Sequence, residues 1–286
     1  MIKLFATDLD GTLLAKNHKA DEYINEMVHM VFDAGCYFAF ATGRNANRAT
    51  PEEIDRPVYH ICMNGALITD LDNTVLYVDT INKDILKELL ETFPDFDFDC
   101  ASVHKTYRRS SKEDWIAEHN KPFKPRHVNP NEKVDTDWHK QFMQDMLENI
   151  VFDCSNEDIL SHDICKVNLH LRNKNYDTKK FDEFLEFHKN QIMNAPCDTG
   201  IYEITNTGTD KGSAVQWLAN YLHVDKDEVA TYGDGGNDIP MLERFKHSYA
   251  PSNGLDYVKK KASEIIGPHY EHSVSQHIIQ TIKESR

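Results

Sequence analysis

The sequence predicts an α/β protein in which a doubly wound parallel sheet is interrupted by an inserted α+β domain. Apolar, strand-like runs alternate with runs of helical periodicity over residues 1–82, and this alternation returns over residues 206–286. Strands that alternate with helices favour a parallel sheet with crossover connections. Residues 83–205 lack the alternation, and a chain of 286 residues is long enough for about two domains. We therefore expect a core domain of residues 1–82 and 206–286, and a second domain of residues 83–205.

The first half of the predicted core opens with the apolar strand LFAT, which runs into Asp8 and Asp10. The segment ADEYINEMVHMVFDAG has apolar residues at helical spacing followed by a glycine, which predicts a helix and its end. CYFAFATGR predicts a buried strand that ends at Thr42, and VYHICMNGALI predicts the next strand. ALITDLDNTVLYVDT has the pattern of a hairpin that turns at Asp72 and Asn73.

The inserted segment mixes helices and strands without a regular order. INKDILKELLETF and DTKKFDEFLEFHKN predict amphipathic helices, and CKVNLHLR and GIYEITN predict strands. The core pattern returns with the helix DKGSAVQWLANYLHV, and EVATYGDGGNDIPMLERF predicts a strand, a polar turn and a further helix. The two outer segments are therefore expected to form one sheet.

The composition limits the possible partners and the compartment. The formal net charge is −15, which argues against a nucleic-acid partner. The six cysteines form no CxxC pair, a usage that is typical of a reducing compartment. The N-terminus becomes acidic too soon for a signal peptide, and no apolar run approaches a membrane span. We expect a cytoplasmic protein without a nucleic-acid or membrane partner, and the sequence leaves its oligomeric state open.

Polar side chains with complementary chemistry follow the predicted strands. Asp8 and Asp10 follow the first strand, and two residues that are two apart on a strand share a face. Two carboxylates about 4 Å apart repel by roughly 4 kcal/mol at an effective dielectric constant near 20, so solvent, a shared proton or a cation must offset this repulsion. Thr42 and Gly43 follow the second strand and add a hydroxyl and a backbone N–H group.

The second half of the core supplies further candidates. Lys211 stands at the start of a predicted helix, and GDGGND carries Asp234, Asn237 and Asp238. Ligands of open α/β sheets bind beyond the carboxyl ends of the strands, so these side chains are expected to converge on one crevice. Carboxylates with few imidazoles or thiols favour a hard cation, Mg²⁺ above all. The hydroxyl, the N–H groups and the lysine suit phosphate oxygens, and a carboxylate can act as nucleophile or proton carrier.

The motifs DLDGTLL, ATGR, DKG and GDGGND resemble, in order and spacing, the four motifs of the haloacid dehalogenase superfamily of phosphohydrolases. The insert between the second and third motifs, and the strand that ends in MNGALI, are similar to the Cof-type branch. The resemblance implies a Rossmann-like core with an α+β cap that closes over the site. It also implies an Mg²⁺-dependent phosphatase that hydrolyses a small phosphorylated metabolite, with a sugar phosphate favoured, through an aspartyl-phosphate.

The resemblance also implies roles for the residues at the start of the chain. Asp8 would be the nucleophile, and Asp10 would protonate the leaving oxygen and later activate water. Both would bind the metal ion, Asp10 through its backbone carbonyl oxygen. Thr42 and the amide of Gly43 would hold a phosphoryl oxygen.

The later motifs complete the implied site. Lys211 would neutralise charge on the nucleophile and on the phosphate, as a catalytic and a phosphate-binding residue. Asp234 and Asp238 would hold Mg²⁺, and Asn237 would orient the phosphate side of the site. The segments YAPSNG and YEHSV, which are expected at the rim of the pocket, depart from the family pattern.

Two other functions share parts of this pattern. A phosphomutase of the same superfamily would return an isomerised ester, whereas a phosphatase releases inorganic phosphate. A signalling receiver domain also uses an acidic cluster, a threonine, a lysine and an aspartyl-phosphate. Receivers are short and uninterrupted, so the insert and GDGGND argue against that class. His269 and His272 could contact a metal, but we expect solvated loop histidines there.

Overall fold

The computed structural model describes residues 1–15, 19–119, 143–144, 146–171, 176–195 and 200–285. The chain divides into two compact units. Unit 1 comprises Met1–Val78 and Thr209–Arg286, and unit 2 comprises Asp79–Gly208. The predicted boundaries at residues 82 and 206 lie a few residues from these limits.

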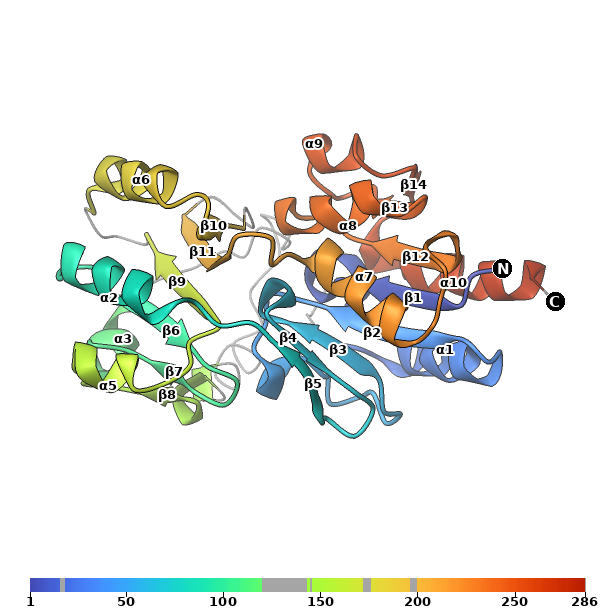
Figure 1. Cartoon of the computed structure of the whole chain (residues 1–286). Helices are drawn as coiled ribbons and strands as arrows, with labels where there is room; N and C mark the ends of the chain where they lie inside the picture. The colour runs from blue at the N-terminus through green and yellow to red at the C-terminus, as the bar shows by residue number, and fades with distance from the viewer. Residues whose placement is uncertain (16–18, 120–142, 145, 172–175, 196–199, 286) are drawn as a thin grey trace. The chain divides into compact units, whose positions relative to one another are not determined.

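Unit 1 is built on an eight-stranded sheet in the order β14-β13-β12-β1-β2-β3-β4-β5 (Figure 1). All pairs from β14 to β3 are parallel, whereas β4 and β5 pair antiparallel and form the predicted hairpin. The predicted α/β class with a parallel sheet is therefore confirmed. The strands are β1 (Leu4–Thr7), β2 (Tyr37–Ala41), β3 (Tyr59–Cys62), β4 (Leu67–Thr69), β5 (Val75–Val78), β12 (Val229–Tyr232), β13 (His247–Pro251) and β14 (Glu264–Ile266).

Helices cover both faces of this sheet, which makes it doubly wound. Helices α1 and α10 pack with Phe5 and Phe38 in one hydrophobic cluster, and α7 and α8 pack with Leu4 and Ala6 in another. Successive residues of β1 therefore point to opposite faces, and both faces are buried, which explains its unbroken apolar sequence. The helices are α1 (Glu22–Asp33), α7 (Lys211–Tyr221), α8 (Ile239–Arg244), α9 (Asp256–Lys259) and α10 (Ser273–Glu284).

Unit 2 contains a six-stranded sheet in the order β10-β11-β9-β6-β7-β8. Its pairs are antiparallel apart from β7 with β8, so it has the α+β character that the sequence predicts. The strands are β6 (Phe98–Ala101), β7 (Thr106–Tyr107), β8 (Ile150–Val151), β9 (Lys166–His170), β10 (Ile192–Asn194) and β11 (Ile201–Asn206). The helices are α2 (Lys83–Thr92), α3 (Lys112–His119), α5 (Asn156–Leu160) and α6 (Thr178–Phe187).

The strand period of two separates an apolar from a polar set of side chains in the sheet of unit 2. Phe98, Val167 and Leu169 belong to the hydrophobic cluster that includes residues of α2, α5 and α6. On β9 the alternating residues Lys166, Asn168 and His170 are polar, and Lys166 binds Glu203 at 2.9 Å. No helix in the described ranges of the chain combines the length and the hydropathy that a bilayer crossing requires.

Arg108 is the centre of a buried ion cluster on the polar side of this sheet. Its guanidinium lies 2.6 Å from Asp99, 2.9 Å from Asp97 and 3.6 Å from Glu118, and its side chain is 1% exposed. Burial by itself would raise the pKa of Asp99, but Arg108 and a hydrogen bond with His170 more than offset this effect. The pKa of Asp99 therefore lies well below its usual range, and the carboxylate is charged next to Arg108.

Replacement of Arg108 by methionine is expected to lower the free energy of unfolding by about 3–5 kcal/mol, because buried carboxylates are left without their cation. Urea denaturation of the full chain measures this loss. Lys87→Met is the matched control, since it removes an exposed pair with Glu91 and should cost less than about 1 kcal/mol. A loss for Arg108→Met as small as that of the control would contradict the role given to the cluster.

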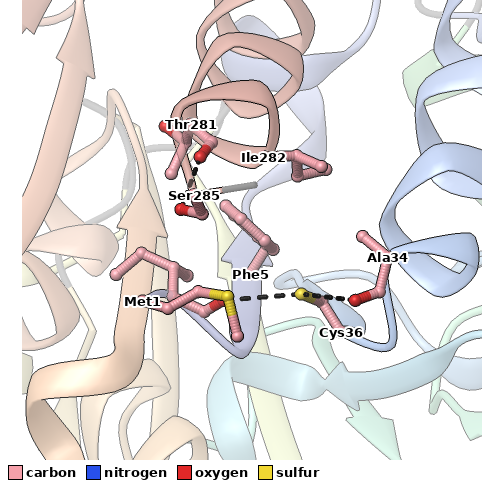
Figure 2. Close-up of a pocket in the computed structure, with 8 residues that line it drawn as sticks. Met1, Phe5, Ala34, Cys36, Thr281, Ile282 and Ser285 are labelled. Carbon is pink, nitrogen blue, oxygen red and sulfur yellow. Dashed lines mark hydrogen bonds between the residues drawn. The ribbon is translucent and has the colours of Figure 1, made fainter.

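A small pocket lies at the amino end of β1, next to the end of α10 (Figure 2). Met1, Phe5, Cys36 and Ile282 are among its lining residues, and the Cys36 thiol lies 3.4 Å from the carbonyl oxygen of Ile2. Asp8 follows the other end of the same strand, so this pocket belongs to the opposite edge of the sheet. Cys36 is buried there and behaves as a small apolar residue.

Candidate active site

Three of the predicted site residues lie just beyond the carboxyl ends of β1 and of the two strands that pair with it. Strand β1 pairs with β2 on one side and with β12 on the other, so it stands where the chain order of the sheet changes direction (Figure 1). Asp8 follows β1, Thr42 follows β2 and Asp234 follows β12. A crevice at such a point is the usual ligand site of open α/β sheets.

Three aspartates form a buried cluster at this point. One carboxylate oxygen each of Asp8, Asp234 and Asp238 lies within 4.8 Å of the others. Lys211 Nζ donates to Asp8 Oδ1 at 2.6 Å and to Asp238 Oδ1 at 2.7 Å, and the ammonium is fully buried. The Thr12 hydroxyl donates to Asp234 Oδ1 at 2.8 Å. Three carboxylates face one ammonium, so this cluster has an excess of negative charge.

The electrostatics of the cluster follow from burial and from this excess. Burial raises the pKa of Asp8 to about 7, although Lys211 lowers it, and the neighbouring Asp238 raises it further. Burial likewise raises the pKa of Asp238. Burial alone would lower the pKa of Lys211, but the two carboxylates outweigh it and the pKa is raised. A further positive charge is needed to stabilise three ionised carboxylates here.

Local backbone structure places each member of the cluster. The Asp8 N–H donates to the Tyr232 carbonyl at 2.9 Å, which extends the pairing of β1 with β12 by one residue. Asp238 Oδ2 accepts from the backbone N–H groups of Asp234 at 2.9 Å and Gly235 at 2.8 Å. A Cβ atom at Gly233 would lie 2.4 Å from Asp238 Cβ, so only glycine allows this close turn.

The start of α7 positions Lys211. Asp210 caps this helix, because its side chain accepts from the Ser213 backbone N–H at 2.7 Å. A Cβ atom at Gly212 would lie 2.3 Å from the carbonyl oxygen of Pro240, so glycine lets α7 approach α8 closely. The DKG motif therefore combines a cap, the buried cation and a helix contact.

Asp10 pairs with the basic side chain of Arg44, whereas Asp8 pairs with Lys211. Its carboxylate accepts from Arg44 Nη2 at 2.6 Å and from Arg44 Nε at 2.8 Å. The strand alternation that we expected to carry both aspartates does not reach them, because β1 ends at Thr7 and the chain turns through Gly11 at φ +82°. The Asp10 carboxylate is not part of the described acidic cluster, and its predicted metal contact was through the backbone carbonyl.

The turns after β2 and β3 bring the remaining predicted residues together. The Thr42 backbone N–H donates to the Ile61 carbonyl at 2.8 Å, and the Asn64 N–H donates to the Thr42 carbonyl at 3.1 Å. Gly43 follows Thr42 in the same turn. Asn237 Nδ2 donates to Asn64 Oδ1 at 3.1 Å, so the motif GDGGND contacts the turn after β3.

Sequence reasoning assigned no role to three residues that the structure brings to this region, Thr12, Arg44 and Asn64. Arg44 is the last residue of the motif ATGR, and Thr12 belongs to DLDGTLL, so both stood inside motifs that we singled out. Asn64 precedes a glycine and adopts φ +58°, which an Asn-Gly pair indicates. The signals were present, but the partners of these side chains lie far away in the sequence.

The segment that departs from the family pattern supports the turn after β1. Asn253 Nδ2 donates to the Gly11 carbonyl at 2.8 Å, and the His269 backbone N–H donates to Asn253 Oδ1 at 2.9 Å. His269 Nδ1 lies 2.8 Å from the Leu14 carbonyl oxygen. The expectation of a solvated loop histidine is wrong for His269, which is 5% exposed, because these contacts bury it.

His272 also differs from the expected solvated loop histidine, because it is partly buried and contacts Asp21. It adopts φ +56° directly before α10, and its Nε2 lies 3.2 Å from an oxygen of Asp21. Neither histidine belongs to the acidic cluster that the described residues form.

The fold and the cluster define a class of protein. A buried set of carboxylates with a lysine lies at the carboxyl end of the central strand of a doubly wound sheet. This position is typical of ligand sites in α/β proteins, and carboxylate oxygens are the ligands that a hard cation prefers. The family model of haloacid dehalogenase-like hydrolases matches residues 5–278, so the chain belongs to this family.

Individual relatives agree with this assignment. The 5-amino-6-(5-phospho-D-ribitylamino)uracil phosphatase YwtE of Bacillus subtilis is 28% identical over 98% of each chain. A haloacid dehalogenase-like hydrolase of B. subtilis has a similar structure, with a TM-score of 0.81 at 20% identity over 97% of this chain and 99% of that one. The subclass IIB sugar phosphatase BT4131 has a TM-score of 0.73 at 20% identity over 98% of each chain. The predicted Cof-type family and a hydrolase of phosphate esters are thereby confirmed.

Proposed function

We propose that this chain is an Mg²⁺-dependent phosphatase of a small phosphorylated metabolite, with sugar phosphates favoured, and that Asp8 forms an aspartyl-phosphate. The observation that carries the proposal is the cluster of Asp8, Asp234 and Asp238 around Lys211, with its excess negative charge. The names of the relatives support the substrate class, since one acts on a phosphoribityl compound and another is a sugar phosphatase.

The donor set of the cluster suits Mg²⁺. Its ligand atoms are carboxylate oxygens, which this cation prefers. We propose Asp8 and Asp234 as the principal ligands, together with the Asp10 backbone carbonyl. Asp238 is also a candidate, although its carboxylate already accepts from Lys211 and from two backbone N–H groups. When bound, the cation would supply positive charge that offsets both the carboxylates and the phosphate.

The side chains account for both halves of the reaction. In the first half, an Asp8 oxygen attacks phosphorus, the bond from phosphorus to the ester oxygen breaks, and Asp10 gives a proton to the leaving oxygen. In the second half, water attacks phosphorus and gives a proton to Asp10, and the bond from phosphorus to Asp8 breaks. Lys211 neutralises charge on Asp8 in both halves.

The turn after β2 supplies the proposed phosphate contacts. Thr42 Oγ1 accepts from the Arg44 backbone N–H at 3.1 Å and retains its own hydrogen for donation to a phosphoryl oxygen. The Gly43 amide and Asn237 are the further predicted phosphate contacts. All these residues belong to unit 1.

Phosphate release from a panel of phosphorylated metabolites tests the proposal. With Mg²⁺ present, the full chain should release inorganic phosphate from at least one sugar phosphate, with kcat/KM near the usual enzyme range of about 10⁴ M⁻¹s⁻¹ or above. Analysis of the product by phosphorus NMR separates the alternatives. An isomerised ester without free phosphate would indicate a phosphomutase, and a stable phospho-Asp8 without turnover would indicate a receiver.

A further inference from the structure

Arg44 and Asp10 form a bidentate ion pair that is partly exposed. The guanidinium donates from Nε to Oδ2 at 2.8 Å and from Nη2 to Oδ1 at 2.6 Å. Two parallel hydrogen bonds fix the plane of the carboxylate as well as its distance. The Asp10 side chain is 35% exposed, and these two hydrogen bonds restrict its rotamers.

Arg44 is itself held by the turn that carries Thr42. Its backbone N–H donates to Thr42 Oγ1 at 3.1 Å, and its carbonyl accepts from the Met63 N–H at 3.0 Å. Its Nη1 donates to the Arg48 carbonyl at 3.3 Å. The backbone of Arg44 is therefore held by the turn after β2, and its guanidinium is held by the Arg48 carbonyl. These contacts fix the position from which Arg44 binds Asp10.

The two aspartates of the first motif bind different basic side chains. Lys211 binds Asp8 on the buried side, whereas Arg44 binds Asp10. The backbone at Asp10 (φ −78°, ψ 114°) and Gly11 (φ +82°) departs from helical geometry. The two hydrogen bonds from Arg44 orient the Asp10 carboxylate that projects from this turn.

We propose that Arg44 is a positioning residue, which holds the Asp10 carboxyl group in the orientation for proton transfer to the leaving oxygen and from the attacking water. This inference rests on the proposed function, in which Asp10 is the acid and base. Arg44 acts through Asp10 and does not touch the reacting atoms. Its replacement should therefore slow those steps that need a proton from Asp10 or a proton transfer to it.

Two esters with different leaving groups separate this role from a general loss of structure. An alkyl ester, the sugar phosphate turned over fastest in the panel, needs a proton on its leaving oxygen, whereas para-nitrophenyl phosphate releases a stable phenolate. Arg44→Ala should lower kcat/KM about 100-fold for the alkyl ester, which is part of the usual contribution of acid–base catalysis. For the aryl ester kcat/KM should change less than about three-fold.

The second half of the reaction gives an independent readout. Because Asp10 also activates the water that hydrolyses the aspartyl-phosphate, Arg44→Ala should accumulate this intermediate with the aryl ester. Rapid mixing should then show a burst of nitrophenolate close to one equivalent per enzyme, followed by slow turnover. Added methylguanidinium should restore part of the alkyl-ester activity of Arg44→Ala. Arg44→Lys should have an alkyl-ester activity between those of the wild type and Arg44→Ala, because lysine lacks the two parallel N–H donors of the guanidinium.

Controls decide between the possible outcomes. Arg56→Ala removes another arginine–aspartate pair of unit 1, with Asp33 at 3.0 Å, and should leave both esters unaffected. The double variant Arg44→Ala/Asp10→Asn should be no slower on the alkyl ester than Asp10→Asn alone. Equal losses on both esters, additive losses in the double variant, or no loss at all would overturn the inference. If the wild-type chain hydrolysed neither ester, the proposed function would fall first and the inference with it.

Discussion

Asp8→Asn should abolish phosphate release, with a fall in kcat of about 10⁴-fold or more, because an amide is a poor nucleophile toward phosphorus. The substitution keeps the size of the side chain. The hydrogen bond from the backbone N–H of residue 8 to the Tyr232 carbonyl is also kept. Release of inorganic phosphate and trapping of the phosphorylated protein by acid quench both measure the effect. Retention of full activity would rule out Asp8 as the nucleophile.

The same variant should fold at least as stably as the wild type when divalent cations are removed. Burial raises the pKa of Asp8 to about 7, so the folded state binds this proton more tightly than the unfolded state does. The contribution of Asp8 to stability is therefore fully present at low pH and is lost as the pH rises through about 7. Asp8→Asn has no carboxyl group to ionise, so this loss of stability with rising pH should be absent from the variant. Thermal melting of the metal-free protein at several pH values measures the difference.

A matched control tests whether the effects of Asp8→Asn on activity and on melting depend on the position of this aspartate. Asp33→Asn changes an exposed aspartate of unit 1, whose partner is Arg56, and should change neither the activity nor the pH dependence of melting appreciably. A melting profile of Asp8→Asn that loses as much stability as the wild type between low and neutral pH would contradict the charge balance described for the cluster.

Removal of divalent cations should abolish turnover, and added Mg²⁺ should restore it. The physical reason is the excess of carboxylate charge in the cluster of Asp8, Asp234 and Asp238, to which a phosphate ester adds further negative charge. EDTA followed by titration with Mg²⁺ measures the effect on phosphate release. Unchanged rates in EDTA would remove the cation from the proposed mechanism.

Melting temperature provides a readout of cation binding that does not depend on turnover. A ligand that binds the folded state at 100 times its dissociation constant adds about 2.7 kcal/mol of stability. Mg²⁺ should therefore raise the melting temperature of the wild type, and this rise should largely disappear in Asp234→Asn. Equal rises in the wild type and in Asp234→Asn would place the cation elsewhere, whereas Asp33→Asn should behave like the wild type.

Much of the fold could be predicted because the signals are local. The apolar run before Asp8, the helical spacing over residues 22–33 and the alternation over residues 166–170 each lie within one element. The order of these elements then limited the topology, since strands joined through helices pair in parallel. The burial of His269 could not be predicted in this way, because it depends on Leu14 and Asn253, which belong to other segments.

The candidate site shows the same division. The sequence by itself determined which acids, hydroxyl and lysine follow the strands, and hence the family and the kind of chemistry. The tertiary structure alone decided that Asp8 binds Lys211 and that Asp10 binds Arg44, although the two acids are separated by one residue. The reason is that the pairing of a basic side chain with a carboxylate depends on their distance and burial. Both are fixed only when β1, β2 and α7 pack together.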